Sequence, residues 1–119
     1  MYIFGGYTSK AVNDFYKYNF ETCVWSKVTS KGQIPSGRSR YSLSKRGDTV
    51  LLVGGFDGEK FLGDVYELNL VTMNWKCWTE ENYPIRGQHV AVVHKDKMLI
   101  FGGNSGKAAL NDFVACYIE

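Results

Sequence analysis

Three glycine pairs recur at a nearly constant interval along this sequence of 119 residues. Each pair ends a short apolar run, at residues 2–6, 51–55 and 99–103, and successive pairs lie 49 and 48 residues apart. Repetition with a period of roughly 50 residues indicates a repeat architecture. In such an architecture one supersecondary unit recurs, and each unit buries its apolar face against its neighbours.

Other features keep the same period. An aspartate opens a second apolar stretch after each glycine pair, at Asp14, Asp64 and Asp112. Apolar and polar residues alternate after each aspartate, which favours half-buried strands. In the first two copies a tryptophan then follows, at Trp25 and Trp75.

A proline-led loop and a further strand complete the pattern. The loops Pro35-Ser36-Gly37-Arg38 and Pro84-Ile85-Arg86 precede strands that we predict over residues 41–45 and 89–94. No window of about 11 residues shows sustained helical spacing of apolar residues. Four predicted strands per full repeat, joined by turn residues, indicate an all-β fold with one four-stranded sheet per repeat, arranged radially.

This ordered set of features resembles the kelch repeat, and the resemblance covers essentially the whole chain. It implies kelch-type β-propeller blades, each a four-stranded antiparallel sheet. A few positions depart from the pattern. Leu68 and Cys116 stand where the first copy has Tyr18, and Tyr41 stands where the family often has histidine, whereas His89 fits that position.

The length of the chain predicts an incomplete ring. Propellers have four to eight blades, so at about 50 residues per blade the smallest needs roughly 200 residues. With strands a to d in each blade, we expect strands b–c–d in residues 1–30, a full blade a–b–c–d in residues 31–80, and strands a–b–c in residues 81–119. We interpret the chain as a piece of a larger propeller or a truncated remnant, with a ring of several copies as the alternative. Because open sheet edges pair with other chains, we expect marginal stability and self-association.

Charge is distributed unevenly along the chain. The formal net charge of +2 is too small to indicate a nucleic-acid partner. Residues 23–47 hold six basic and no acidic residues, whereas residues 48–81 hold seven acidic and two basic residues. This pattern is typical of ordinary solvated loops, or it marks a basic loop surface that attracts an acidic partner segment.

The cysteines and the hydropathy bear on location. Cys23, Cys77 and Cys116 lie at no metal-binding spacing and look like strand residues. Disulfide pairing stays open, but a reducing compartment is favoured, so we expect a cytoplasmic protein. The sequence shows no signal-like segment and no apolar run near the ~20 residues of a membrane span, so we expect no membrane partner.

The residues predict no catalytic site and no cofactor. We expect His89 to be a core residue and His94 to be solvated. No nucleophile has a recognisable base beside it in the sequence, and the serine-elbow and phosphate-loop patterns are absent. The glycine pairs lack a following helix, so backbone turns explain them better than phosphate binding.

Some kelch-like propellers are oxidases that hold copper with tyrosine and histidine. This raises the question of a copper site at Tyr7, Tyr16, Tyr18 and Cys23. No second histidine lies near them, so we expect no metal.

Residues that recur at the repeat period are expected to be structural. We expect the aspartates to bond local backbone in turns and the two tryptophans to pack between blades. For Arg38 and Arg86, structural hydrogen bonds or stacking are favoured over ligand contact.

The kelch resemblance implies that partners dock on the loops between strands b and c and between strands d and a. The residue after each glycine pair differs between copies while the glycines do not, and Arg40 and Gln88 follow the repeated arginines by two positions. Arginine offers a planar fork for carboxylates, and aromatic residues are enriched at interface hot spots. The predicted partner-binding residues are Tyr7, Thr8, Arg40, Phe56, Asp57, Gln88, Asn104 and Ser105. The alternative is that they are solvated loop residues.

The resulting prediction is a non-catalytic protein-interaction module, part of an adaptor or scaffold protein, that binds an acidic or polar protein segment. One alternative is a structural, actin-associated assembly module. Another is an enzyme on a kelch-like propeller, such as a copper oxidase.

Overall fold

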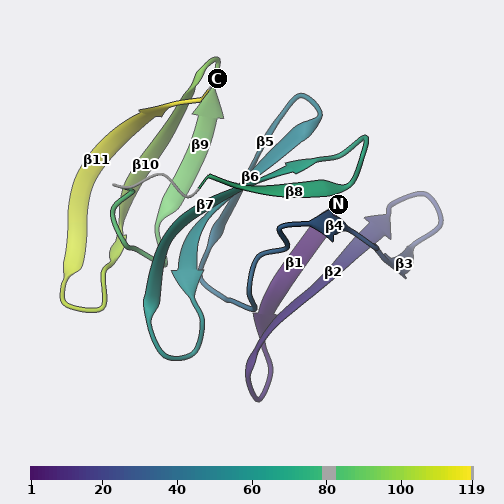
Figure 1. Cartoon of the computed structure of the whole chain (residues 1–119), viewed down its shortest axis with the longest axis horizontal. Coiled ribbons are helices and arrows are strands. Elements are labelled where there is room, and N and C mark those ends of the chain that lie inside the picture. The colour runs from purple at the N-terminus through teal and green to yellow at the C-terminus, as the bar shows by residue number, and fades with distance from the viewer. Residues whose placement is uncertain (79–82, 119) are drawn as a thin grey trace.

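The computed structural model describes residues 1–78 and 83–118, and within these ranges it contains eleven β-strands and no helix (Figure 1). The strands are β1 (Tyr2–Tyr7), β2 (Ala11–Asn19), β3 (Val24–Lys27), β4 (Lys31–Gly32), β5 (Ser42–Arg46), β6 (Thr49–Phe56), β7 (Phe61–Asn69), β8 (Asn74–Trp78), β9 (Val90–His94), β10 (Lys97–Asn104) and β11 (Ala109–Tyr117).

These strands form three sheets that stand side by side (Figure 1). The strand orders are β1-β2-β3 in the first sheet, β4-β8-β7-β6-β5 in the second and β11-β10-β9 in the third. By their place in the repeat, β5 and β9 are strands a; β1, β6 and β10 are strands b; β2, β7 and β11 are strands c; and β3 and β8 are strands d. The all-β fold with blades that do not close into a ring is confirmed. The expected blade boundary at residues 80 and 81 lies outside the described residues, as do the acidic residues Glu80 and Glu81.

The second sheet has one strand more than the four that the sequence predicts. The two residues of β4 pair in parallel with β8, while every other pairing is antiparallel. Lys31 donates its backbone N–H to the Met73 carbonyl at 3.0 Å, and Gln33 donates to the Trp75 carbonyl at 2.9 Å. After it leaves the first sheet, the chain therefore runs along the β8 edge of the second sheet before it reaches β5 at the opposite edge.

The glycine pairs form bulges in the strand b–strand c hairpins. Register shifts occur between Phe4 and Gly6, between Val53 and Gly55, and between Phe101 and Gly103. Gly54 has a φ of 59°, and a Cβ atom there would collide with the carbonyl oxygen of Arg86. Glycine is required because it adopts this backbone conformation readily and leaves room for the chain segment that crosses from the next repeat.

The core lies between sheets. Phe4 and Phe15 of the first sheet pack against Leu52, Leu68 and Trp75 of the second. Successive side chains of a strand point to opposite faces of the sheet, so residues next to these in the second sheet lie on its other face. There Leu51, Val53 and Val65 pack against Met98, Ile100 and Ile118. Among the three described sheets, the middle one therefore packs on both of its faces.

The outer faces of the first and third sheets keep apolar residues in contact with solvent. Trp25 is 48% exposed, whereas its counterpart Trp75 is 1% exposed. Trp75 packs between blades as predicted, at ring-centroid distances of 5.4 Å from Phe4 and 6.1 Å from Phe15. The same prediction for Trp25 is wrong within the described structure, because Trp25 lies on the outer face and its ring contact is with Tyr18 of the same sheet.

The three cysteines are free thiols. Cys77 and Cys116 lie in β8 and β11, but Cys23 precedes β3 in a turn with a φ of 56°, so the strand expectation for Cys23 is wrong. Within the described ranges, no helix has the length and apolar character needed to cross a bilayer.

Candidate partner-binding face

Three hairpin loops lie at one end of the three sheets (Figure 1). They connect β1 to β2, β6 to β7 and β10 to β11. The segments that lead into β5 and β9 pass beside these hairpins, because Ser39 bridges to Phe56 and Gly87 bridges to Asn104. We call this end of the molecule, formed by the three hairpin loops and residues 38–41 and 86–89, the loop face.

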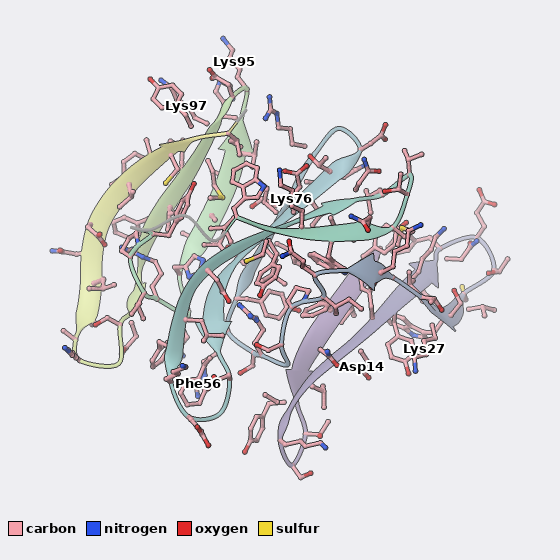
Figure 2. All side chains as sticks on the ribbon, viewed as in Figure 1. Asp14, Lys27, Phe56, Lys76, Lys95 and Lys97 are labelled. Carbon is pink, nitrogen blue, oxygen red and sulfur yellow. The ribbon has the colours of Figure 1, made fainter. Side chains whose placement is uncertain are left out.

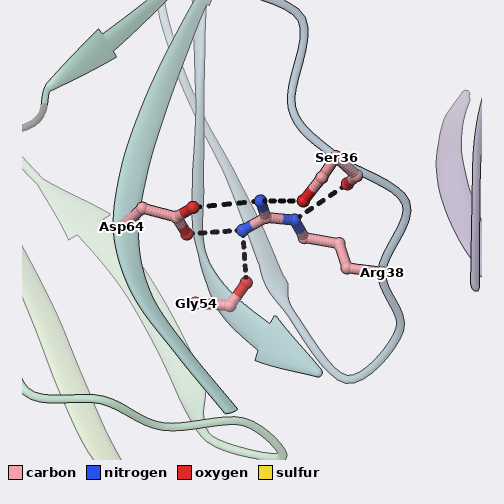
Figure 3. Close-up of polar contacts among 4 residues, drawn as sticks. All are labelled: Ser36, Arg38, Gly54 and Asp64. Atoms are coloured by element: carbon pink, nitrogen blue, oxygen red, sulfur yellow. Dashed lines mark hydrogen bonds and ion pairs between the residues drawn. The ribbon is translucent and has the colours of Figure 1, made fainter. Parts of the chain in front are cut away.

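A buried arginine anchors the first of the two crossing segments (Figure 3). The Arg38 side chain is 0% exposed, and its Nη1 and Nη2 atoms donate to the two carboxylate oxygens of Asp64 at 2.5 and 3.0 Å. Nη1 also donates to the Gly54 carbonyl at 3.0 Å. Two further bonds go to Ser36, from Nε to its carbonyl and from Nη2 to its hydroxyl, each at 3.1 Å.

Arg86 repeats this arrangement in the third sheet. Its Nη1 donates to the Gly102 carbonyl at 2.8 Å, and the guanidinium bonds both carboxylate oxygens of Asp112 at 2.9 and 2.7 Å. This pairing holds the pKa of Asp112 below its ordinary value, because the guanidinium stabilises the carboxylate. The structural role expected for both arginines is confirmed. The role expected for Asp64 and Asp112 needs correction, because both pair with an arginine rather than with local backbone.

The backbone of each arginine bonds a different sheet from its side chain. Gly6 donates its N–H to the Arg38 carbonyl at 2.8 Å, and Arg38 donates its N–H to the Val12 carbonyl at 3.2 Å, both in the first sheet. Gly55 donates in the same way to Arg86 at 3.0 Å. Each arginine therefore links two successive sheets and fixes the path of the residues that follow it.

Two residues after each arginine, the chain adopts an uncommon backbone conformation. Arg40 has a φ of 60° and Gln88 a φ of 59°, which is the left-handed region that non-glycine residues rarely occupy. Gln88 donates its N–H to the Arg40 carbonyl at 2.8 Å, so the two residues lie next to each other. Both are exposed. The structure thus brings two of the predicted partner-binding residues together.

Arg40 also lies over the aromatic ring of Phe56. Its guanidinium carbon is 5.1 Å from the ring centroid, and the Phe56 ring lies 5.0 Å from that of Phe61. Figure 2 shows Phe56 at the end of the molecule opposite to Lys95 and Lys97. A cation backed by an aromatic pair is held in place without being neutralised.

Three of the predicted partner-binding residues bond their own loops. Asp57 accepts the N–H groups of Glu59 and Lys60 at 2.9 Å each, and these bonds lower the pKa of the Asp57 carboxyl. Asn104 accepts the Gly106 N–H at 2.7 Å. The Ser105 hydroxyl oxygen lies 3.3 Å from both the Lys107 and Ala108 nitrogens. These side chains use hydrogen-bond acceptors to hold their own loops in shape, so fewer acceptors are free for a partner.

Tyr7 and Thr8 belong to the hairpin of the first sheet. Tyr7 is exposed, as is Thr8. Across residues 1–78 and 83–118, no hydrogen bond or ring contact joins either residue to the Arg40–Phe56 pair. The loop face therefore has its aromatic and cationic centre on the second sheet, with Tyr7 as a separate aromatic residue on the first.

The six basic residues of the 23–47 stretch do not form one surface. Arg38 is buried and ion-paired, and Arg46 donates from Nη1 to the Ile118 carbonyl at 2.9 Å. Lys45 and Arg46 end β5, whereas Arg40 precedes its start. Arg40 is thus the basic residue of this stretch that the fold places beside Phe56.

Sequence reasoning missed two contacts between sheets. His89 Nε2 lies 2.8 Å from the Ser42 hydroxyl, and Tyr41 donates its hydroxyl to the Phe4 carbonyl. His89 is buried, as predicted, and its pKa falls to about 4 because burial penalises the charged form and the Arg86 charge lies close. Ser42 and His89 are 47 residues apart, so only the repeat register brings them together.

The Ser42–His89 pair lacks the third group of a hydrolytic site. The Nδ1 atom of His89 has no hydrogen-bond partner among the described residues. With a pKa of about 4, the imidazole is a poor general base near neutral pH. In the part of the chain that the structure describes, no group of three histidine, cysteine or acidic residues is arranged to hold a metal ion.

Comparison with known proteins identifies the repeat. The sequence profile of the KLHDC2/KLHL20/DRC7 Kelch-repeats domain matches residues 1–119. Tip elongation aberrant protein 1 of Schizosaccharomyces pombe is 33% identical over 97% of this chain and 11% of its own length. The human leucine-zipper-like transcriptional regulator 1 is 32% identical over 92% of this chain and 14% of its own length. Kelch domain-containing protein 10 of Mus musculus is 32% identical over 87% of this chain and 25% of its own length.

The chain therefore spans a quarter or less of the length of these three relatives. The match to the kelch profile runs from the first residue to the last, and the glycine bulges, the Asp–Arg pairs and the repeated hairpins recur within it. This chain belongs to the kelch-repeat family.

Proposed function

We propose that this chain is a non-catalytic protein-interaction module that binds an acidic protein segment on its loop face. The observation that carries the proposal is the exposed Arg40 guanidinium, held 5.1 Å from the Phe56 ring centroid by a backbone in the left-handed region. Conformations of this kind cost of order 1 kcal/mol and cluster at binding sites.

An acidic group suits Arg40 because the residue keeps its hydrogen-bonding capacity for a ligand. No carboxylate of residues 1–78 or 83–118 forms a salt bridge with Arg40, while Arg38 and Arg86 each have one. A guanidinium group offers parallel donors that match a carboxylate. Phe56 and Phe61 supply apolar area beside the cation, so an aspartate or glutamate flanked by an apolar residue fits best.

The charge of the neighbouring loop limits long-range attraction. Asp57 directly follows Phe56, over which Arg40 lies, and shares the β6–β7 loop with Glu59 and Lys60, so the loop beside the Arg40–Phe56 pair carries a net negative charge. Recognition on this face then rests on a direct bond to the guanidinium rather than on a broad electrostatic field. The alternative kelch-like enzyme finds no support in the Ser42–His89 pair, whose imidazole is buried, is weakly basic and bonds no orienting carboxylate of residues 1–78 or 83–118.

Peptide binding tests the proposal. The probes are peptides that alternate glutamate with leucine or tyrosine, and matched peptides with glutamine in place of glutamate. We expect the wild-type chain to prefer the glutamate peptides by at least about tenfold, and Arg40→Glu to abolish the preference. Lys45→Glu makes the same charge change at the far end of β5 and is the matched control, which should keep the preference. Equal binding of both peptide sets by the wild-type chain would refute an acid-binding face.

The cellular role follows from the same proposal. A module without its own chemistry acts by holding a partner, as adaptor or scaffold proteins do. The three free thiols suit a reducing compartment such as the cytoplasm. Fluorescence microscopy of the chain, tagged at either end, would test that location.

A further inference from the structure

The hairpin between β6 and β7 is closed by an aromatic pair, unlike the hairpins of the other two sheets. The last cross-strand pairs before the three loops are Tyr7 with Ala11, Phe56 with Phe61, and Asn104 with Ala109. Phe61 therefore stands where the first and third repeats have alanine. Its ring lies 5.0 Å from the Phe56 ring, which in turn lies beneath the Arg40 guanidinium (Figure 2). A residue that serves the blade scaffold recurs in each repeat, so an aromatic ring in one repeat of three points to a local role.

Two glycines of the third repeat receive the Phe61 ring. A Cβ atom at Gly87 would lie 2.9 Å from both Cδ1 and Cε1 of the ring, and a Cβ atom at Gly106 would lie 3.0 Å from Cδ2. Both distances are shorter than the contact distance of two carbon atoms. The φ of Gly87 lies outside the left-handed region, so the approach of the ring, rather than the backbone conformation, requires glycine there. The ring is thus held between the crossing segment and the third hairpin.

The equivalent positions one repeat earlier have the opposite sizes. Ser39 is the counterpart of Gly87, because each of them bridges to the residue that follows a glycine pair. Ala11 is the counterpart of Phe61. A small hairpin residue thus goes with a side chain on the crossing segment, and a large hairpin residue goes with glycine. This exchange of sizes indicates that the two positions are matched to each other.

Phe61 supports Arg40 in two ways. The first is through Phe56, whose ring lies 5.0 Å from the Phe61 ring and 5.1 Å from the guanidinium carbon of Arg40. The second is through Gly87, against which the Phe61 ring lies. Gly87 precedes Gln88, and the Gln88 N–H bonds the Arg40 carbonyl at 2.8 Å. One side chain therefore supports both the ring beneath the guanidinium and the backbone that carries it.

We propose that Phe61 is a positioning residue that sets the specificity of the loop face for acidic segments. This role rests on the acid-binding function proposed above. Phe61 holds the Phe56 ring in place, and Phe56 holds the Arg40 guanidinium where a carboxylate bonds two of its parallel donors. With alanine at position 61 the Phe56 ring loses this support, and the arginine side chain must be ordered by the ligand itself, which costs conformational entropy on binding.

The preference for glutamate over glutamine peptides, defined under the proposed function, tests this role. Phe61→Ala should reduce the preference roughly two- to fivefold, the effect expected when a cation loses its place over a ring. Loss of apolar contact weakens both peptides alike and leaves their ratio unchanged. Phe61→Tyr keeps the ring and should keep the preference. Phe20→Ala, which removes an exposed phenylalanine from the turn between β2 and β3, is the matched control and should also keep it. An unchanged preference in Phe61→Ala would overturn the proposal.

A double variant separates positioning from stability. Gly87→Ser alone should lower the urea midpoint of unfolding, because its Cβ atom collides with the Phe61 ring. In the Phe61→Ala background the same change recreates the Ala11 and Ser39 arrangement, so the loss should be much smaller. The double variant should nevertheless keep the reduced preference for glutamate. Recovery of the preference in the double variant would show that Phe61 only supports the fold, and the proposal would be wrong.

The NMR signals of the Arg40 side chain test the positioning without any ligand. The Phe56 ring lies over this side chain, so its ring current shifts the δ-methylene protons of Arg40 upfield. Phe61→Ala should move these signals toward the values of an unstructured arginine, and Phe20→Ala should leave them in place. A wild-type chain that shows no glutamate preference would refute the acid-binding function, while a shift that depends on Phe61 would still support the positioning. Arg40 signals that do not respond to Phe61→Ala would overturn it.

Discussion

The guanidinium of Arg38 and the carboxylate of Asp64 meet through two hydrogen bonds of 2.5 and 3.0 Å across 26 residues of sequence. The backbone of Arg38 bonds the first sheet, while its side chain bonds the second. Arg38 therefore connects the first and second blades through its backbone and its side chain. Arg86, paired with Asp112, makes the same connection between the second and third blades.

Removal of Arg38 should destabilise the fold strongly. Arg38→Ala leaves Asp64 and the Gly54 carbonyl without their partner, and loss of one member of a buried ion pair costs 3–5 kcal/mol. Asp64 keeps 29% side-chain exposure, so water compensates in part and we expect a loss of about 3 kcal/mol. Arg86→Ala should cost less, because Asp112 is 47% exposed. Urea unfolding of both variants measures the difference, and equal losses would contradict the role of solvent access.

Stability should fall in mild acid because of His89. The pKa of His89 is about 4 in the folded chain and about 6.5 in the unfolded chain. Above pH 6.5 both states hold a neutral imidazole. Between pH 6.5 and 4 the unfolded chain binds a proton that the folded chain does not, so the free energy of unfolding drops, by up to about 3 kcal/mol.

Two variants isolate the His89 contribution. His89→Gln should flatten the dependence between pH 7 and pH 4.5, whereas His94→Gln should retain it because His94 is exposed. The measurement stops at pH 4.5 to keep Asp112 out of the titration. The pKa of Asp112 is lowered from its ordinary value of 3.8, so this residue reduces stability only below pH 3.8, where its protonation weakens the bond to Arg86. If His94→Gln flattened the pH dependence and His89→Gln did not, the effect would come from His94 and the prediction would be wrong.

Arg40 should contribute to binding without contributing to stability. Glycine relieves a left-handed conformation that costs about 1 kcal/mol, and this gain offsets the lost contact with Phe56, about 0.5–1 kcal/mol. The free energy of unfolding of Arg40→Gly should therefore lie within about 0.5 kcal/mol of the wild-type value, while the variant loses the preference for acidic peptides. Arg40→Ala keeps the strain, loses the contact and should be less stable than Arg40→Gly. The reverse order of these two variants in thermal unfolding would rule out the strain.

The two repeated tryptophans should behave differently. Trp75→Ala removes a side chain that is 1% exposed and packed on Phe4 and Phe15, so the expected loss is about 3–5 kcal/mol. Trp25 is half exposed on the outer face, and Trp25→Ala should cost under about 1 kcal/mol. Denaturant unfolding of the two variants side by side provides the measurement.

The outer faces predict head-to-tail association of copies. Phe101 and Phe113 of the third sheet hold the repeat positions of Phe4 and Phe15, yet Phe113 is 67% exposed. The first sheet exposes Ile3 and Trp25, which hold the positions of the buried Leu52 and Trp75. The third sheet of one copy can therefore pack on the first sheet of another, as the first packs on the second.

Sedimentation velocity tests this association. Wild-type chain should sediment faster as concentration rises, and Phe113→Glu and Trp25→Glu should each remain monomeric. A mixture of the two variants restores one intact pair of faces, because the contact joins different surfaces of the two copies, and should give a heterodimer. Dimers of Phe113→Glu alone would point to a symmetric contact instead.

The sequence was sufficient to predict the elements that repeat. The glycine pairs, the Asp-led strands and the period of roughly 50 residues predicted all-β blades and an open ring, because each of these features serves a local need for a turn or a half-buried strand. The burial of Trp75 and the structural role of Arg38 followed from the same reasoning. The predicted face residues Arg40, Phe56 and Gln88 do come together.

Contacts that depend on the neighbouring blade escaped prediction. The Asp64–Arg38 and Ser42–His89 contacts join residues 26 and 47 positions apart, and no local pattern announces them. Trp25 and Trp75 occupy the same repeat position, but only one has a blade on its apolar side. The left-handed conformation of Arg40 could not be predicted either, because the sequence usually indicates such a conformation by a glycine and here the residue is arginine.

The 26-residue separation between Arg38 and Asp64 also sets an order of events during synthesis. At roughly 5–20 residues per second, the arginine leaves the ribosome about one to five seconds before its carboxylate. During that interval its backbone can already join the first sheet, while its guanidinium lacks the Asp64 carboxylate. The ion pair that ties the second blade to the first thus forms only after β7 has been translated.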